Sequence, residues 1–319
     1  MGFKLSSMAA LMAIALPLSA VSAAPLQPAP ATVAVNATAA SMLAAVWATD
    51  HLVAVGDHGV VLLSDAQGRN LRQAHSVPLS SPLTGVSFVD ARQGWAVGHW
   101  GAILQTSDGG NNWKIQRLDT EVDRPLFAVH LFDSQHGVAV GLWSLVLTTD
   151  DGGKTWSEQT LTPPPGAKRA DLNLMGLFSD SRGTLYAPAE RGQLLRSDDR
   201  GKSWKYIDTG YNGTLWSGAV LDDGSLLVGG QRGTLLHGDA DGQGWQRVPL
   251  QSKGSITAIA VTGRQVLAVG LDGLMVKSVD GGQRFEEQQA PESVPLTASV
   301  LDATGSPMIF SQRGVLTRQ

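Results

Sequence analysis

A turn built around one small residue recurs through most of the chain at a nearly constant interval. The turn residues are Gly59, Gly101, Ser144, Gly192, Gly233, Gly273 and Gly314. The successive intervals are 42, 43, 48, 41, 40 and 41 residues. Twelve residues after each of the first six turns comes a large apolar residue: Leu71, Trp113, Trp156, Trp204, Trp245 or Phe285. Because this inner spacing is fixed while the repeat length varies, each repeat is expected to be one structural unit.

The repeat between Gly94 and Trp113 reads as a strand, a tight turn, a strand, a second turn and the start of another strand. Apolar side chains alternate through it, which is the period of β-structure, and glycines mark turns that need positive φ angles. No apolar stripe of helical period follows residue 24. A repeat of about 40–45 residues with four strands is typical of a propeller blade. The sequence therefore predicts an all-β, seven-bladed β-propeller of four-stranded antiparallel blades.

The last repeat ends at Gln319, soon after its third strand. An unpaired strand edge invites aggregation, so a propeller is expected to close its ring. The segment Thr32 to Val35 has strand character and lies ahead of the first repeat. We therefore predict that this N-terminal strand completes blade 7.

Residues 1–23 have the pattern of a secretory signal peptide. Lys4 precedes an apolar run from Met8 to Leu18, which is too short to span a bilayer, and small residues lead to a cleavage site predicted after Ala23. A retained membrane anchor is the alternative. The predicted organisation is a signal peptide (1–23), a lead-in with the closing strand (24–41) and the propeller (42–319). Export and the absence of cysteine from the sequence predict a periplasmic location, with secretion left open.

Composition narrows the classes of function. Charged residues make up 16% of the chain and the net charge is −4, whereas nucleic-acid binding calls for a basic domain. The absence of cysteine excludes thiolate metal sites. Histidines form no closely spaced pair, although His58 and His99 occupy equivalent turns in neighbouring repeats. We predict no cofactor, no metal site and no nucleic-acid partner.

The turn before each large apolar residue carries a Ser/Thr-x-Asp-x-Gly-x-x-Trp pattern, the Asp box. It is complete at residues 106–113, 149–156 and 197–204, has Phe285 for tryptophan in the sixth repeat, and is degenerate in the first and fifth. The aspartate is expected to accept hydrogen bonds from its own turn, and the tryptophan is expected to pack between blades. These boxes are therefore interpreted as structural.

A second motif is narrower. Residues 90–98 spell D-A-R-Q-G-W-A-V-G, and residues 133–141 repeat it as D-S-Q-H-G-V-A-V-G. With the V-G-x-x-G turns and the Asp boxes, this pattern resembles the photosystem II stability/assembly factor-like family of seven-bladed propellers, over nearly all of the chain after residue 23. The resemblance implies a non-enzymatic assembly factor that binds newly made membrane-protein subunits. Cyanobacterial members carry a lipobox cysteine that is missing here, which puts the photosynthetic role in doubt but not the fold.

The sequence does not offer the catalytic residues that the enzymatic alternatives require. A sialidase needs an arginine cluster, an acid and a tyrosine nucleophile, but the three tyrosines of the chain stand at positions that favour packing or lack such partners. The acidic pairs Asp222-Asp223 and Glu286-Glu287 fall at a turn and an outer strand, where solvated carboxylates are usual. A hydrolase would have to use Asp57, Glu190 or Asp272 near the turns. A lectin that stacks sugars on Trp100, Trp143 and Trp216 stays open as the other alternative.

The residues just before each turn glycine are expected to surround one mouth of the propeller channel, because the first strand of each blade begins at the same end. They are rich in tryptophan and arginine, which are enriched at binding hot spots. The second residue of each first strand is expected nearby. The predicted partner-binding residues are His58, His99, Trp100, Phe127, Trp143, Arg191, Trp216, Arg232 and Arg313. The expected partner is a membrane protein or membrane-protein complex on its periplasmic side, with a glycan as another candidate, and the chain is expected to be monomeric.

Overall fold

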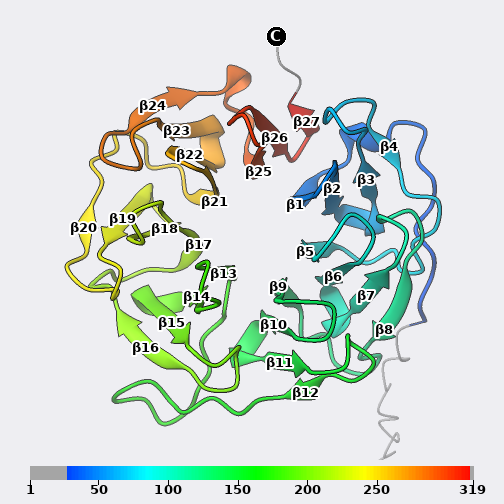
Figure 1. Ribbon diagram of the computed structural model, residues 1–319, viewed down its shortest axis with the longest axis horizontal. Coiled ribbons are helices and arrows are strands. Elements are labelled where there is room, and N and C mark those ends of the chain that lie inside the picture. Colours follow the sequence, from blue (N-terminus) through cyan, green and yellow to red (C-terminus); the bar gives the residue numbers. More distant parts are fainter. Residues whose placement is uncertain (1–26, 317–319) are drawn as a thin grey trace, which may run out of the picture.

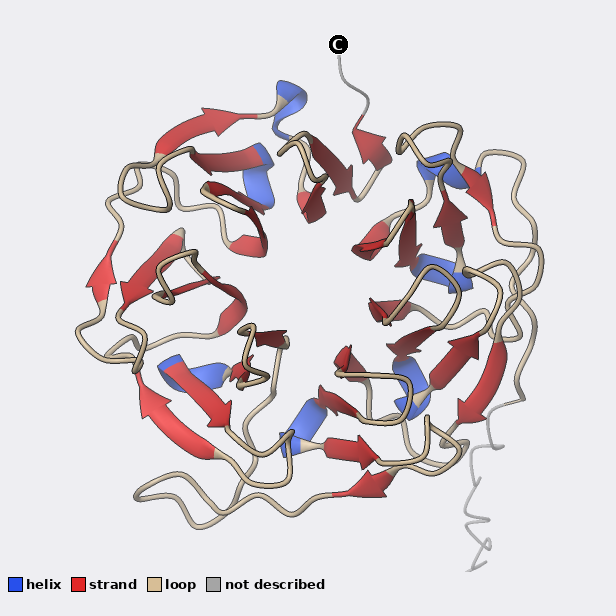
Figure 2. Cartoon of the chain, viewed as in Figure 1, coloured by secondary structure: helices blue, strands red, loops and turns tan. Residues whose placement is uncertain are grey.

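The computed structural model describes residues 27–316, which form a ring of seven antiparallel sheets around a central axis (Figure 1). The predicted seven-bladed β-propeller is thus confirmed. Six blades have four strands and blade 7 has three among the described residues. Strands follow one another from the axis outward in every blade, so each sheet is a meander (Figure 2). No helix among the described residues has both the length and the apolar character to cross a membrane.

The first four blades have the following strands. Blade 1 contains β1 (Met42–Ala48), β2 (His51–Gly56), β3 (Val61–Leu63) and β4 (Arg72–Gln73). Blade 2 contains β5 (Leu83–Phe88), β6 (Gly94–Gly98), β7 (Ile103–Thr106) and β8 (Lys114–Arg117). Blade 3 contains β9 (Leu126–Leu131), β10 (Gly137–Gly141), β11 (Val146–Thr149) and β12 (Ser157–Glu158). Blade 4 contains β13 (Phe178–Ser179), β14 (Leu185–Pro188), β15 (Gln193–Ser197) and β16 (Lys205–Asp208).

The last three blades and the short helices complete the ring. Blade 5 contains β17 (Leu215–Val220), β18 (Leu226–Gly230), β19 (Thr234–Gly238) and β20 (Gln246–Arg247). Blade 6 contains β21 (Ile256–Thr262), β22 (Gln265–Gly270), β23 (Leu274–Ser278) and β24 (Glu286–Gln289). Blade 7 contains β25 (Leu296–Leu301), β26 (Pro307–Ser311) and β27 (Gly314–Leu316). The 3-10 helices are η1 (Ala37–Ala39), η2 (Asp57–Gly59), η3 (His99–Gly101), η4 (Leu142–Ser144), η5 (Glu190–Gly192), η6 (Leu271–Gly273) and η7 (Pro291–Ser293).

The hydrophobic core is divided among the seams between neighbouring blades. Trp113 of blade 2, for example, packs in one cluster with Val53, Leu63 and Ala74 of blade 1. Trp204 of blade 4 likewise joins the cluster that contains Val138 of blade 3. Since each blade presents a nearly continuous apolar face to each neighbour, burial ties every blade to the next and closes the ring.

The Asp boxes are engaged within their own turns. The Thr106 hydroxyl donates to Asp108 Oδ1 at 2.9 Å and accepts the buried Gly110 N–H at 3.0 Å. Asp108 Oδ1 also accepts the Asn112 N–H at 3.0 Å, and the indole N–H of Trp113 donates to Gly110 O at 2.8 Å. The bonds of the hydroxyl and the carboxylate recur at Asp151 and Asp199. The indole bond recurs at Trp204 but not at Trp156, whose buried Nε1 has no partner among the described residues. The box side chains therefore fold the outer turn.

Acidification is expected to weaken the fold in two separate pH windows. Burial lowers the pKa of His130, on β9, from its ordinary 6.5 to about 4. A base whose folded pKa is depressed stabilises the protein above its unfolded pKa, and that stability is lost as the pH falls from about 6.5 to about 4. Amide N–H groups of Gln135 and His136 hold the pKa of Asp133 at about 2 rather than 3.8, and the Thr155 N–H lowers that of Asp151. The carboxylate contribution is therefore lost below about pH 4.

The measurement is the urea midpoint of unfolding as a function of pH. We expect the wild type to lose stability between pH 6.5 and 4, and a His130→Gln variant to stay nearly level there and fall only below about pH 4. If both proteins lost stability in parallel between pH 6.5 and 4, His130 would not be the group that titrates.

The expected closing strand is wrong for the described part of the chain. β27 pairs only with β26 among these residues, and residues 31–34 lie along blade 1. There Ala31 N donates to Val77 O, Ala34 N donates to Gln73 Oε1 and Gln73 Nε2 donates to Thr32 O, each at 2.9 Å. The Gln73 side-chain amide thus makes the hydrogen bonds to residues 32 and 34 that a neighbouring strand would otherwise make. Val33 and Val35 stay exposed to solvent. The chain then turns at η1, and the Thr38 carbonyl lies against Gly314.

Candidate partner-binding face

The tight turns between the second and third strands of all blades lie at one end of the ring, here called the hairpin face. In each blade, the first residue of this turn donates its N–H to a carbonyl just ahead of the innermost strand. Asp57 N thus bonds Ser41 O at 2.9 Å, and His99 N bonds Pro82 O at 3.1 Å. The remaining pairs are Leu142 with Pro125, Glu190 with Asn173, Gln231 with Thr214, Leu271 with Ser255 and Gln312 with Pro295. The predicted site residues are therefore brought to a common face.

The hairpin tips have an unusual choice of residue. In six blades the central residue has a left-handed backbone, with φ between 54° and 61°: His58, Trp100, Trp143, Arg191, Arg232 and Asp272. The next residue also has positive φ and is glycine in five of these turns, as in a type I′ turn. Such turns favour asparagine, aspartate or glycine at the first position, so Asp272 suits its turn, and the left-handed region costs other L-residues about 1–2 kcal/mol. The tryptophan and arginine side chains at the tips are therefore not explained by the needs of the turn.

This strain gives a testable consequence for stability. Arg232 is exposed and its side chain has no ion pair or hydrogen bond among the described residues. Its replacement by a smaller residue therefore breaks no polar interaction within the fold. We expect Arg232→Gly to be more stable than Arg232→Ala by about 1 kcal/mol, because glycine adopts φ 57° without a steric cost. The measurement is the free energy of unfolding in urea. An alanine variant as stable as the glycine variant would show that this turn is unstrained.

Apolar side chains are exposed in the sector of blades 2 and 3. Trp143 is 56% exposed, although its backbone N–H is held by Asn173 Oδ1 at 3.0 Å. Val122, on the loop between β8 and β9, is 48% exposed. The next residue, Asp123, accepts the Trp100 N–H at 2.6 Å and contacts His99 Nδ1 at 3.0 Å. This loop is thereby fixed against the β6–β7 turn.

The sector formed by blades 4, 5 and 7 is basic, because it carries three arginines at or next to its turn tips. Arg191 lies 3.9 Å from Asp171 and Arg313 lies 3.1 Å from Glu292. Arg232 has no ion pair among residues 27–316. Both observed pairs are exposed, and pairs of this kind stabilise a protein by only about 0–1 kcal/mol. The guanidinium groups can therefore exchange these partners for a ligand carboxylate at little cost.

Phe127 and Trp216 lie on the inner edge of the hairpin face. A β-bulge leaves one residue unpaired at the start of the innermost strand, at Phe127 in blade 3 and Trp216 in blade 5. Blades 2, 6 and 7 have threonine at this position. The hydroxyls of Thr84, Thr257 and Thr297 donate to carbonyls of the following blade. Phe127 and Trp216 cannot make this bond, and both are half-buried.

The structure adds residues that sequence reasoning missed. Asp123 and Asn173 hold the backbones of Trp100 and Trp143, and Val122 extends the apolar sector. All three lie in loops whose lengths differ from blade to blade, so no repeat position marked them.

Three of the carboxylates considered for hydrolysis hold loops. Glu190 accepts the Asn173 N–H at 2.9 Å and its side-chain amide at 3.1 Å. Glu287 accepts the N–H groups of Gln251 and Ser252, and Asp223 accepts the N–H and the hydroxyl of Ser225. Among residues 27–316, no three His, Cys, Asp or Glu side chains are grouped to hold a metal ion.

Comparison with known proteins confirms the resemblance seen in the sequence. The model of a family described as photosynthesis system II assembly factor YCF48 matches residues 64–205, from the end of β3 to the start of β16. No curated protein sequence matches the chain.

Solved structures show the same fold. YCF48 bound to D1 peptide is 20% identical with a TM-score of 0.71, covering 87% of this chain and 92% of its own. YCF48 from Cyanidioschyzon merolae is 17% identical with a TM-score of 0.69, covering 90% and 97%. The β-propeller domain of Cps50 (Swd1) from Myceliophteria thermophila is 13% identical with a TM-score of 0.67, covering 88% and 98%.

Proposed function

We propose that this chain is a non-enzymatic, exported binding or assembly factor that docks a segment of a membrane protein on its hairpin face. The observation that carries the proposal is the choice of residue at the turn tips. Tryptophan, arginine and histidine stand where the turn itself favours asparagine or glycine. Strain that persists at a surface without structural need points to function. The kind of partner is supported by the similar fold of YCF48 bound to D1 peptide.

The chemistry of the face suggests an amphipathic partner segment. Its acidic end would meet the arginines of blades 4, 5 and 7, which can bind carboxylates with two parallel hydrogen bonds. Its apolar end would meet Trp143, Trp100 and Val122 in blades 2 and 3. Exposed aromatic and aliphatic side chains on one face favour such contacts.

Export remains a proposal, because residues 1–26 lie outside the described part of the chain. The periplasm is the compartment we propose, after cleavage behind Ala23. N-terminal sequencing of the protein recovered from a periplasmic fraction should then start at Ala24. Recovery of the uncleaved chain from the cytoplasm would contradict export.

Trp143→Ala is expected to weaken partner capture by about tenfold or more, because truncating a central tryptophan of an interface often costs about 2 kcal/mol. The measurement is the amount of membrane protein retained from detergent-solubilised membranes by the immobilised variant. Val279→Ala is the matched control, because Val279 is 78% exposed but belongs to the Asp-box turn of blade 6, away from the hairpin face. Equal loss in both variants would argue against docking on the hairpin face.

A further inference from the structure

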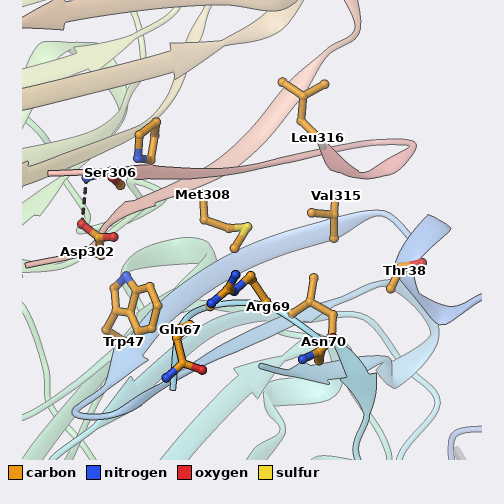
Figure 3. A pocket seen from close by; sticks show the side chains of 13 residues that line it. Thr38, Trp47, Gln67, Arg69, Asn70, Asp302, Ser306, Met308, Val315 and Leu316 are labelled. Carbon is orange, nitrogen blue, oxygen red and sulfur yellow. Dashed lines mark hydrogen bonds between the residues drawn. The ribbon is translucent and has the colours of Figure 1, made fainter. Parts of the chain in front are cut away.

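A groove opens on the outer side of the ring where blade 7 meets blade 1 (Figure 3). Its volume is about 710 Å³. Trp47, Leu71, Met308 and Val315 supply apolar surface, and Gln67 and Arg69 lie at its rim. The groove extends from Thr38, beside the β26–β27 turn, to the turn between β25 and β26.

The groove coincides with the place of a missing strand. The other six blades have a fourth strand, whereas β27 is the outermost strand of blade 7 in the described chain. Fourth strands, or the first three residues after them, usually send a buried apolar side chain into the seam with the next blade. These residues are Ala74, Leu161, Ile207, Val248 and Ala290. No fourth-strand residue fills the corresponding place between blades 7 and 1 in residues 27–316.

Blade 1 widens the groove from the other side. Its Asp box is degenerate, and Leu71 stands where complete boxes have tryptophan. In the seam of blades 4 and 5, Trp245 and Ile207 pack in one cluster, so a box residue and a fourth-strand residue cover each other. Leu71 is smaller and has no such fourth-strand partner, so apolar surface stays open to solvent.

The groove carries a positive charge at Arg69. The Arg69 side chain is exposed and forms no salt bridge within the described residues, although its backbone N–H and its charge both lower the pKa of the nearby Asp65 carboxyl. The one carboxylate at the groove, Asp302, binds the N–H groups of Thr304 and Ser306 in its own turn. A ligand that fits should therefore carry an aliphatic side chain for the floor and a carboxylate for Arg69.

We propose that the groove binds an extended segment of a partner protein, which adds to β27 as the fourth strand of blade 7. The unpaired edge of a strand offers backbone donors and acceptors to such a segment. Thr38 covers Gly314, so pairing begins at Val315. The segment places one aliphatic side chain on Leu71 and Met308 and one carboxylate near Arg69. The site is separate from the hairpin face, but Arg313 precedes β27, so one partner can contact both.

A probe for this site can be derived from the chain itself. The fourth strand of blade 4 and its flank, residues 205–210 with the sequence K-Y-I-D-T-G, place Ile207 in a seam. Because successive side chains of a strand point to opposite faces, the last two side chains before the glycine are exchanged, so that the carboxylate lies on the same face as the isoleucine in the sequence K-Y-I-T-D-G. A fluorescein-labelled peptide of this sequence is titrated with full-length mature protein and its anisotropy is followed. The matched peptide has asparagine in place of isoleucine. We expect saturable binding of the first peptide and binding weaker by about tenfold for the second.

Two groove variants and two controls complete the test. Leu71→Asp removes the aliphatic floor and places a carboxylate there, so it should abolish peptide binding, and Arg69→Glu should weaken it by about tenfold at low salt. Lys114→Glu, on the exposed outer strand of blade 2, should change nothing. Trp143→Ala should also leave peptide binding unchanged, so failure of this site and failure of the hairpin face can be told apart. Cooperative unfolding in urea verifies that each variant is folded.

Three results would overturn the proposal. The first is no binding of the isoleucine peptide to the wild type. The second is equal binding to the wild type, Leu71→Asp and Arg69→Glu, which would put the peptide elsewhere. The third is dimerisation of the wild type that Leu71→Asp abolishes, which would assign the groove to a second copy of the chain.

Discussion

Deletion of residues 24–40 is expected to destabilise the propeller by about 2–4 kcal/mol, whereas deletion of residues 24–35 should cost much less. The longer deletion removes η1, whose Ala37 is buried in the cluster that joins Met42 and Phe310 across the seam of blades 1 and 7. It also uncovers Gly314, against which the Thr38 carbonyl lies. The shorter deletion removes only the segment that runs along blade 1, where Val33 and Val35 are exposed.

The measurement is the urea unfolding of both truncated proteins beside the mature protein that starts at Ala24. Equal stability of all three would show that the seam does not depend on η1. A large loss already in the shorter deletion would show that the hydrogen bonds of residues 31–34 to blade 1 carry the closure instead.

The seven blades could be predicted because a propeller repeats its constraints. A blade needs a turn with positive φ before its third strand and an apolar residue in the seam with the preceding blade. Residues equivalent to Gly101 and Trp113 therefore recur at a fixed spacing in the first six blades. The contact that closes the ring occurs only once in the fold, so no repeated spacing in the sequence predicts it. Thr32 to Val35 alternates like a strand, yet the Gln73 side chain binds its backbone and holds it on blade 1. This competition between a side-chain amide and a sheet edge depends on contacts remote in sequence.

The candidate site could be predicted in part for the same reason. The turn tips occupy repeat positions, so Trp143 and Arg232 could be assigned to one face from their spacing. Their left-handed backbones became visible only in three dimensions. Asp123, which ties the β8–β9 loop to the tip of blade 2, lies in a connecting loop whose length differs from blade to blade. The outer groove escaped prediction because it arises from a missing strand and from the small size of Leu71.

The Arg232→Ala/Arg313→Ala double variant is expected to retain about tenfold less membrane partner than the wild type at low salt. Two exposed guanidinium groups on one face attract an acidic segment, and salt screens that attraction over a Debye length of about 3 Å at 1 M. The difference between the double variant and the wild type should therefore shrink in high salt. Trp143→Ala should show the same relative loss at both salt concentrations, because its contribution is apolar.

A double variant that captured as much partner as the wild type at low salt would exclude the arginine sector from the interface. Arg284→Ala is the matched control, since Arg284 is an exposed arginine in the Asp-box turn of blade 6, away from the hairpin face. It should leave both the capture and its salt dependence unchanged.

The central claim, that the hairpin face contacts a membrane partner, is tested most directly by site-specific photocrosslinking. p-Benzoylphenylalanine is placed at position 143 on the hairpin face or at position 279 in the Asp-box turn of blade 6, both exposed in the folded protein. After irradiation with native membranes, adducts are identified by mass spectrometry. We expect an adduct between position 143 and an extramembrane segment of a membrane protein, and none from position 279. Adducts from position 279 alone would contradict it and move the docking surface to the opposite face of the ring.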